Sequence, residues 1–224
     1  MQLVDLTLPV QEDHGGDGKL PPEIFGKYAG KQTVFPEDRI HKHKYVDYIS
    51  VTYGFEYLAI RGTFIDFPGH IIKTDDGMHA ENYPLEKLYR VDATVIHLDR
   101  ADGSGGIGAE ELRMACPGPV TGGALVVNAL GKRRYDGIQR GSVYLERDAV
   151  AWIVDTGVYL LVSDVYEASE PRGVFLDLFG NGISAVCCPI NLDQLTTPKV
   201  KLTVLMPRFP GVTQLPCRAL AEVE

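Results

Sequence analysis

The sequence lacks the long hydrophobic runs that hold a protein in a membrane. No stretch reaches the about 18 consecutive apolar residues of a membrane span, and no apolar segment of the signal type stands at residues 1–10. Cysteine is also scarce. The four cysteines form no Cys-x-x-Cys pair, and the adjacent Cys187 and Cys188 are poorly placed for a disulfide with each other. We therefore expect a reduced, cytoplasmic protein without a membrane partner.

The sequence lacks an excess of positive charge as well. Its 22 lysine and arginine residues are outnumbered by 30 aspartate and glutamate residues, which gives a formal net charge of −8. Nucleic acids and anionic membrane surfaces attract basic proteins, so this balance argues against both as the main partner. It places no limit on a small-molecule substrate, which is the partner we expect.

The residues that are present predict a single α/β domain over residues 1–224. Apolar residues make up 45% of the chain and charged residues 23%, which is enough for a sizeable core. Continuous apolar runs at 123–130 and 159–164 predict strands buried on both faces. The apolar spacing within 146–157 predicts a helix that ends at its glycine. Strands that alternate with short helices are typical of α/β folds.

Composition and pattern assign the remaining segments. Residues 11–38 are rich in glycine, proline and charge and predict an extended arm. Aromatic and β-branched residues predict a hairpin or two successive strands at 48–67. We further expect strands at 3–10, 91–99 and 199–206, a helical turn at 84–90, and a plain turn at 103–108 before a helix at 109–115.

The stretch GTFIDFPGH, residues 62–70, combines a carboxylate and an imidazole with proline and glycine. Side chains two apart on an extended strand share a face, so Ile60, Phe64 and Asp66 are expected to project together. Pro68 then ends the strand, and His70 can fold back beside Asp66. This geometry would gather functional side chains on one wall of a cleft.

Residues 60–70 resemble the signature of the cyclase family, His-x-Gly-Thr-His-x-Asp-x-Pro-x-His. This family includes bacterial kynurenine formamidases and isatin hydrolases. The positions that match are Gly62, Thr63, Asp66, Pro68 and His70. The segments DLTLPV, LFGNGISAVCCPINLDQL and CRALAEV also resemble the family, so the likeness covers nearly the whole chain. It implies the family's swivelling β/β/α domain with a mixed central sheet, assembled as a homodimer or homotetramer.

The departures from the family concern its metal ligands. The two metal-binding histidines of the signature fall on Ile60 and Phe64. A further histidine and a glutamate of two-metal members fall on Phe175 and Cys187. Of the family's metal set only Asp66 matches, and one carboxylate with one imidazole binds a divalent ion poorly. We therefore expect no cofactor, and Zn or Mn only if other side chains replace the missing ligands.

Asp66 and His70 are the candidate catalytic residues, as a general acid–base pair. The alternative is structural, with Asp66 capping backbone amides and His70 packed under a loop. The candidate substrate-binding residues are Ile60, Phe64, Phe67, Phe175 and Cys187. For the apolar ones the alternative is core packing. For Cys187 the alternatives are a small buried hydrophobe or, with a nearby base, a nucleophile.

Other candidates are weaker. Arg61 is out of phase with the cleft-facing residues and is expected at the surface or a subunit interface. His79 could rim a pocket, and the HKHK stretch at 41–44 is expected to be a solvated basic edge. The sequence does not rank the possible hydroxyl donors, which are Tyr53, Tyr57 and Tyr166.

Three functions remain open. The first is a metal-independent enzyme that uses acid–base chemistry for a cyclisation, dehydration or related elimination on a small, aromatic or natural-product-like substrate. The second is a metal-dependent hydrolase of amides or lactones, of the kynurenine formamidase type. The third is a binding or scaffold protein that has kept the fold without the chemistry.

Overall fold

The computed structural model describes residues 1–10, 31–34, 40–42, 47–49, 53–56 and 58–223. The chain divides into two compact units, Met1–Pro9 with Gly62–Glu224, and Val10–Arg61. The predicted arm at 11–38 belongs to the second unit, and most of it lies outside the described residues. In this unit two antiparallel pairs are formed, β2 (Lys31–Val34) with β5 (Tyr53–Glu56) and β3 (Ile40–Lys42) with β4 (Asp47–Ile49).

The first unit contains a large sheet, short helices and single 3-10 turns. Its strands are β1 (Gln2–Asp5), β6 (Phe64–Asp66), β7 (Val91–His97), β8 (Gly105–Ile107), β9 (Ala124–Asn128), β10 (Val143–Leu145), β11 (Leu160–Ser163), β12 (Ser184–Cys187), β13 (Lys199–Leu205), β14 (Gln214–Pro216) and β15 (Arg218–Val223). Its helices are α2 (Ala109–Ala115), α3 (Arg147–Asp155) and α4 (Val174–Gly180), and its 3-10 turns are η2 (Pro68–His70), η3 (Ile72–Thr74), η4 (Leu85–Lys87), η5 (Tyr135–Gly137) and η6 (Leu192–Gln194).

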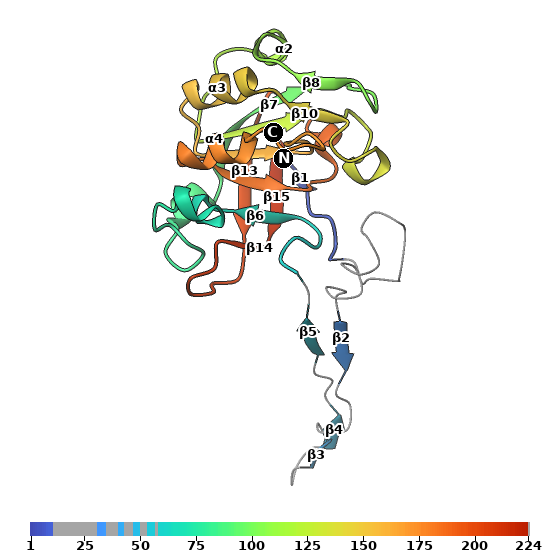
Figure 1. The fold of residues 1–224 in the computed structure, drawn as a ribbon. Coiled ribbons are helices and arrows are strands. Elements are labelled where there is room, and N and C mark those ends of the chain that lie inside the picture. Colours follow the sequence, from blue (N-terminus) through green and yellow to red (C-terminus); the bar gives the residue numbers. More distant parts are fainter. Residues whose placement is uncertain (11–30, 35–39, 43–46, 50–52, 57, 224) are drawn as a thin grey trace. The chain divides into compact units, whose positions relative to one another are not determined.

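Nine strands form one mixed sheet in the order β1-β15-β13-β7-β9-β11-β12-β6-β14 (Figure 1). Strands β7, β9, β11 and β12 run parallel to one another, and the strands on either side join them antiparallel. Strand β1 pairs with β15, so the two ends of the chain lie side by side at one edge. This arrangement confirms the predicted α/β fold with a mixed central sheet.

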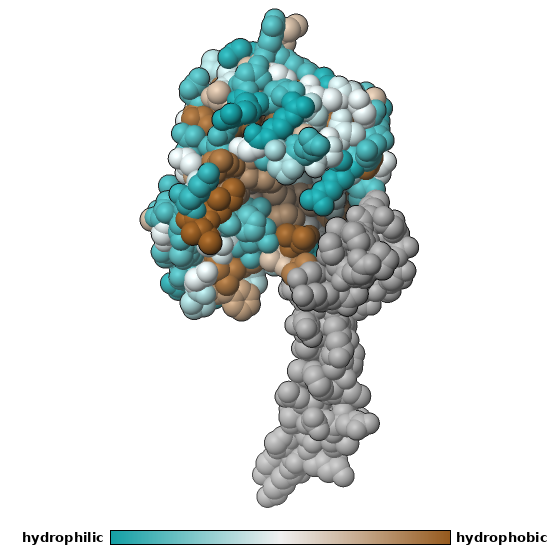
Figure 2. Space-filling view, in the orientation of Figure 1, coloured by the Kyte–Doolittle hydropathy of each residue, from teal (hydrophilic) through white to brown (hydrophobic). Residues whose placement is uncertain are grey.

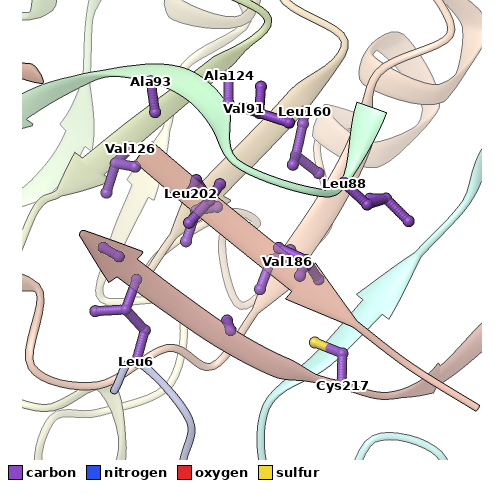
Figure 3. Packing of buried hydrophobic residues seen from close by; sticks show 14 of the residues in the cluster. Leu6, Leu88, Val91, Ala93, Ala124, Val126, Leu160, Val186, Leu202 and Cys217 are labelled. Carbon is purple, nitrogen blue, oxygen red and sulfur yellow. The ribbon is translucent and has the colours of Figure 1, made fainter. Parts of the chain in front are cut away.

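The central strands are buried on both faces because their side chains alternate between two hydrophobic clusters. In β9, Ala124 and Val126 belong to one cluster, and Leu125 and Val127 to the other. The first cluster is enclosed where the sheet curls, so that Val126 and Val186 meet residues of the last strands (Figure 3). The second cluster is covered by α2, α3 and α4, whose buried side chains complete it.

Most of the predicted elements are confirmed. The strands expected at 91–99, 123–130, 159–164 and 199–206 are β7, β9, β11 and β13, and the helix expected within 146–157 is α3. The plain turn predicted at 103–108 is wrong, because Gly105–Ile107 form strand β8 beside β10. A Cβ at Gly106 would collide with the Glu146 side chain, so a larger residue here would have to displace that side chain. In the part of the chain that the structure describes, no helix combines the length and hydrophobicity needed to cross a membrane.

Candidate functional site

The stretch 62–70 is shaped by a left-handed glycine and a buried hydroxyl. Gly62 has a φ of 78°, a conformation that glycine adopts without a steric penalty. The Thr63 hydroxyl accepts the Leu8 backbone N–H at 2.7 Å and donates to the Cys188 carbonyl at 2.8 Å. Thr63 thereby ties the start of β6 to the segment after β1 and to the end of β12.

This local structure limits β6 to Phe64–Asp66, so the extended strand predicted from Ile60 is wrong for its first half. Ile60 lies in a turn, belongs to the second unit and is 44% exposed. Arg61, which we expected at the surface or a subunit interface, is half-buried.

Asp66 lies between β12 and β14, opposite Ala185 on one side and Gln214 on the other. The Cys187 thiol donates a weak hydrogen bond to Asp66 Oδ2, with 3.8 Å between sulfur and oxygen. Asp66 Oδ1 is buried and has no hydrogen-bond partner among the described residues. Phe64 lies opposite Cys187, so the structure brings Phe64, Asp66 and Cys187 together.

Burial raises the pKa of the Asp66 carboxyl from 3.8 to about 6, although attraction to His70 opposes this rise. The Gln214 side chain also lies close enough to lower the pKa of Asp66. In the described part of the chain, however, the one side-chain hydrogen bond of normal geometry that Gln214 makes goes to His70, and none goes to Asp66. Asp66 is only 3% exposed, so its charge acts in a poorly solvated environment.

His70 stands at the end of η2, is exposed, and does not bond directly to Asp66. Its Nε2 lies 3.2 Å from Nε2 of the Gln214 amide, which stands opposite Asp66 in the sheet. Pro68 begins η2 and fixes its first residue, and the Thr74 hydroxyl donates to the Pro68 carbonyl at 2.7 Å. In the described part of the chain no direct hydrogen bond joins Asp66 and His70, and Gln214 is a neighbour of both.

An aromatic row extends from His70 into the second cluster. The His70 ring meets Phe179 edge-on, with 6.5 Å between centroids. Phe179 packs against Phe175 at 5.5 Å, and Phe175 stacks on Tyr166 at 4.9 Å. In Figure 2, hydrophobic surface lies in the region where α4 and β6 appear in Figure 1. Phe175, half-buried on α4, is thus connected to His70 through Phe179 and belongs to the group of side chains around Asp66 and His70.

Phe67 does not belong to this group. It follows Asp66 by one position and points to the opposite side, where it is fully buried in the first cluster against Tyr83. The centroids of these two rings are 4.7 Å apart. The structure therefore places Phe67 in the core, apart from Asp66.

The cysteines near Asp66 are unsuited to nucleophilic chemistry. Burial raises the pKa of the Cys187 and Cys217 thiols far above the ordinary value and that of Cys188 to about 11. The thiolate is the reactive form, so these side chains stay protonated near neutral pH. Cys187 acts in this structure as a small buried side chain that donates to Asp66.

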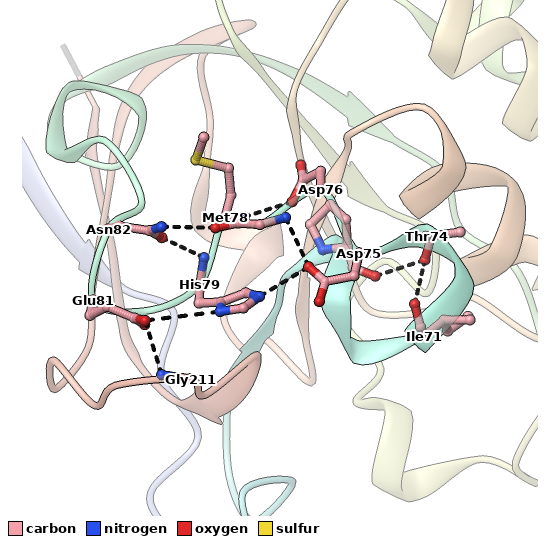
Figure 4. A network of polar contacts seen from close by, with 11 residues as sticks. Ile71, Thr74, Asp75, Asp76, Met78, His79, Glu81, Asn82 and Gly211 are labelled. Carbon is pink, nitrogen blue, oxygen red and sulfur yellow. Dashed lines mark hydrogen bonds and ion pairs between the residues drawn. The ribbon is translucent and has the colours of Figure 1, made fainter.

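Two other candidates are occupied by structural hydrogen bonds. The Tyr166 hydroxyl accepts the Ser163 N–H and lies 2.8 Å from the Val186 carbonyl oxygen. His79 is held in a surface loop, with Nε2 3.0 Å from Asp75 and Nδ1 3.9 Å from Glu81 (Figure 4). The side chains of the 41–44 stretch, Tyr53 and Tyr57 lie outside the described residues.

A polar cavity of about 480 Å³ opens elsewhere, at the carboxyl ends of β7 and β9. His97 and Asn128 line it, and neither Asp66 nor His70 does. His97 Nε2 lies 2.8 Å from the Leu195 carbonyl, and Nδ1 lies 3.0 Å from the Asn128 amide nitrogen. Both ring nitrogens therefore have partners inside the protein, whereas His70 Nδ1 has none among the described residues.

The family resemblance implies a divalent metal, which the described residues around Asp66 do not fit. Nowhere in the described part of the chain do three His, Cys, Asp or Glu side chains gather as a metal-binding group. The positions of the other family ligands hold Ile60, Phe64 and Phe175, whose side chains have no atom that binds a metal.

A family comparison decides the relationship. The model of the Cyclase family matches residues 4–168 of this sequence. The chain belongs to the Cyclase family. No curated protein matches it.

Solved structures show the same fold at low sequence identity. A predicted metal-dependent hydrolase from Bacillus stearothermophilus is 17% identical, with a TM-score of 0.71 and coverage of 98% of this chain and 97% of that one. Isatin hydrolase A from Labrenzia aggregata is 17% identical, with a TM-score of 0.69 and coverage of 100% and 94%. Isatin hydrolase A from Ralstonia solanacearum is 18% identical, with the same TM-score and coverage of 100% and 92%.

Two members of the group in this Cyclase-family chain, Gln214 and Phe179, are not predicted from the sequence. Gln214 lies 144 positions after His70 and is the first residue of a three-residue edge strand. Phe179 has the spacing of an ordinary core residue on α4. Only the pairing of β14 with β6 and the packing of α4 against η2 reveal them.

Proposed function

We propose that this Cyclase-family chain is an enzyme that performs acid–base chemistry on a small aromatic substrate, by a cyclisation, a dehydration or a related elimination. One observation carries the proposal. The exposed imidazole of His70 stands near the buried carboxylate of Asp66, and the amide of Gln214 lies between them. A desolvated carboxylate that supports an exposed imidazole is a common arrangement in general acid–base catalysis.

His70 is the group of the pair that reaches a substrate. In a dehydration, its imidazole takes a proton from the carbon next to a carbonyl group, and the electron pair of that C–H bond forms the new double bond. The imidazolium then gives the proton to the departing hydroxyl, which leaves as water. Asp66 is too buried to touch the substrate, and its negative charge stabilises the transient imidazolium.

The aromatic row supports a substrate with an aromatic ring. Buried Phe179 packs between His70 and Phe175, and half-buried Phe175 is the phenylalanine of the row that keeps exposed ring surface. Two solved structures of similar fold hold aromatic compounds: isatin hydrolase A from Labrenzia aggregata is bound to benzyl benzoate, and another isatin hydrolase is bound to the product analogue thioisatinate. Aromatic rings pack well in such surroundings, so we extend this preference to the present chain.

The second candidate is a metal-dependent hydrolase of amides or lactones, favoured by the similarity to isatin hydrolases. It would need ligands beyond the described group around Asp66. Metal content separates the two candidates. Elemental mass spectrometry of untagged protein purified without chelator should find no stoichiometric zinc or manganese under the first proposal. One or two equivalents would support the hydrolase.

The direct test compares wild-type protein with His70→Ala and with His79→Ala as the matched control, since His79 is an imidazole held outside the group. Each protein is incubated with a panel of small aromatic β-hydroxy ketones, isatin and N-formyl aromatic amines, and products are followed by mass spectrometry. Loss of water from a panel member in wild type and His79→Ala, but not in His70→Ala, is expected. Turnover that survives in His70→Ala contradicts the role of His70. A protein that binds panel members without turning any over would be a binding protein.

A further inference from the structure

The polar cavity of about 480 Å³ has the position and the size of a small-molecule site, although neither Asp66 nor His70 lines it. It lies at the carboxyl ends of β7 and β9, which are neighbouring parallel strands. In α/β sheets, ligands commonly bind outside this end of the strands. Its volume falls within the range of about 300–1,000 Å³ that is typical of ligand pockets. The side chains that line the cavity then determine which class of ligand it suits.

The charged side chains of the cavity leave one cation and one carboxylate without a partner. Arg133 and Asp99 pair with each other, with 2.5 Å between Nη1 and Oδ1. Lys132 and Asp193 also line the cavity, and both are exposed. Within the described part of the chain neither of these two makes an ion pair or a side-chain hydrogen bond, so they do not pair with each other either. The cavity therefore offers two separate and opposite charges to a ligand.

Asn128 adds a hydrogen-bond acceptor at the wall of the cavity. The Leu195 carbonyl only accepts, so His97 Nε2, at 2.8 Å, carries a proton, and in the neutral ring Nδ1 presents its lone pair. The Asn128 amide nitrogen, 3.0 Å from Nδ1, therefore donates to it. This leaves Asn128 Oδ1 as an acceptor, and it is buried without a partner among the described residues. Because buried acceptors rarely lack a donor, we expect the cavity to favour a molecule that carries N–H groups.

The turn that follows β9 and forms part of the cavity is held in place by the protein itself. Asp164, directly after β11, accepts two consecutive backbone N–H groups, from Ala129 at 2.9 Å and from Leu130 at 3.1 Å. Gly131 has a φ of 63°, a left-handed conformation that glycine adopts without a steric penalty. A ligand that binds to such a preorganised turn loses little free energy in ordering it.

We propose that this cavity binds a free amino acid, with the carboxylate of the ligand at Lys132 and its ammonium group at Asp193. A free amino acid carries one charge of each sign, whereas a simple anion would satisfy only the lysine and a simple amine only the aspartate. The ammonium group also has three N–H donors, as the acceptor at Asn128 favours. This site is separate from the candidate pair, so the inference does not rest on the proposed function.

The test is isothermal titration calorimetry of the wild-type protein with a panel of the common free amino acids near neutral pH. Saturable binding of at least one of them is expected. The amino acid that binds best is then compared with its amide, which lacks the carboxylate, and with its N-acetyl derivative, which lacks the ammonium group. Each analogue should bind about tenfold more weakly or worse, since each loses one charge-assisted contact.

Two substitutions each remove one charge from the cavity. Lys132→Met and Asp193→Asn should each weaken binding of the amino acid by about tenfold or more. Lys132→Met should also bind the amide as well as it binds the amino acid, because the partner of the carboxylate is gone. The matched controls Lys73→Met and Asp155→Asn alter exposed residues outside the cavity and should bind as the wild type does, as should His70→Ala. Because the analogues are tested on the wild-type protein, the inference stays testable if a variant fails to fold.

Three results would each overturn the inference. The first is the absence of saturable binding by every amino acid of the panel, and the second is an analogue that binds as tightly as the amino acid itself. The third is binding that is lost in His70→Ala and kept in Lys132→Met, which would place the amino acid beside the candidate pair. Turnover of the aromatic substrate panel is measured separately, so failure of the proposed function and failure of this inference are told apart.

Discussion

Replacing Asp66 by asparagine should alter how the stability of the protein depends on pH. The carboxyl has a pKa raised by burial from 3.8 to about 6, which corresponds to about 3 kcal/mol, since one pH unit of displacement is worth about 1.4 kcal/mol. A carboxyl with a raised pKa in the folded state favours folding fully below its unfolded pKa. That contribution is lost as the pH rises through the folded pKa.

The wild-type free energy of unfolding should therefore fall, through this one group, by about 2 kcal/mol between pH 4 and pH 7, because part of the full effect lies below pH 4. Asp66→Asn has no charge to bury, so it lacks this decline. Its free energy of unfolding minus that of the wild type should rise by about 2 kcal/mol across the same range. The asparagine amide also changes the contacts with Cys187, but that change does not depend on pH in this range.

The assay is urea unfolding of both proteins at half-unit steps from pH 4.5 to pH 8, monitored by circular dichroism. Asp193→Asn, at an exposed carboxylate on η6, is the control and should follow the wild-type curve. Asp164 has its own pKa raised to about 6 by burial, but it is unchanged in both proteins and cancels from the difference. A difference between Asp66→Asn and wild type that stays constant from pH 4.5 to pH 8 would refute the reasoning.

Three further predictions concern the frame around the site. Gly62→Ala places a side chain at a φ of 78° and should lower the free energy of unfolding by about 1 kcal/mol in urea titrations, whereas Gly137→Ala, with open space around it, should have a smaller effect. Thr63→Val leaves the Leu8 N–H without its partner and should lower the free energy of unfolding by about 1–3 kcal/mol in the same titrations. A decrease below about 0.5 kcal/mol would contradict the role given to the hydroxyl. The buried, protonated thiol of Cys187 should react with a thiol reagent only after unfolding, and fast labelling found by mass spectrometry in the folded protein would contradict its burial.

The sequence was sufficient for the α/β class because its strongest signals are local, whereas the mixed central sheet was predicted from the family resemblance. The continuous apolar run in β9 and the helical spacing in α3 each reflect a single element with one way to bury its side chains. The prediction of a turn at Gly105–Ile107 was wrong because the strand there depends on contacts that are distant in sequence. A glycine-rich segment gives no pattern of its own, and it becomes a strand only because β10 and Glu146 lie next to it.

The site was predictable only where its members are close in sequence. Asp66 and His70 are four residues apart and follow from one motif, and Phe175 and Cys187 came from the family resemblance. Strand alternation would have placed Phe67 opposite Asp66, in the core where it lies. Gln214 could not be predicted, because only the register between β14 and β6 brings it to Asp66.

The pairing of β14 with β6 has a consequence for the order in which the protein is made. His70 and Gln214 are separated by 144 positions, and β15, which follows β14 directly, pairs with β1. Contacts of such long sequence separation form late, after the intervening chain has collapsed. A ribosome-bound chain that still lacks its last two strands therefore holds His70 without its partner. The candidate site is therefore complete only once β14 has paired with β6.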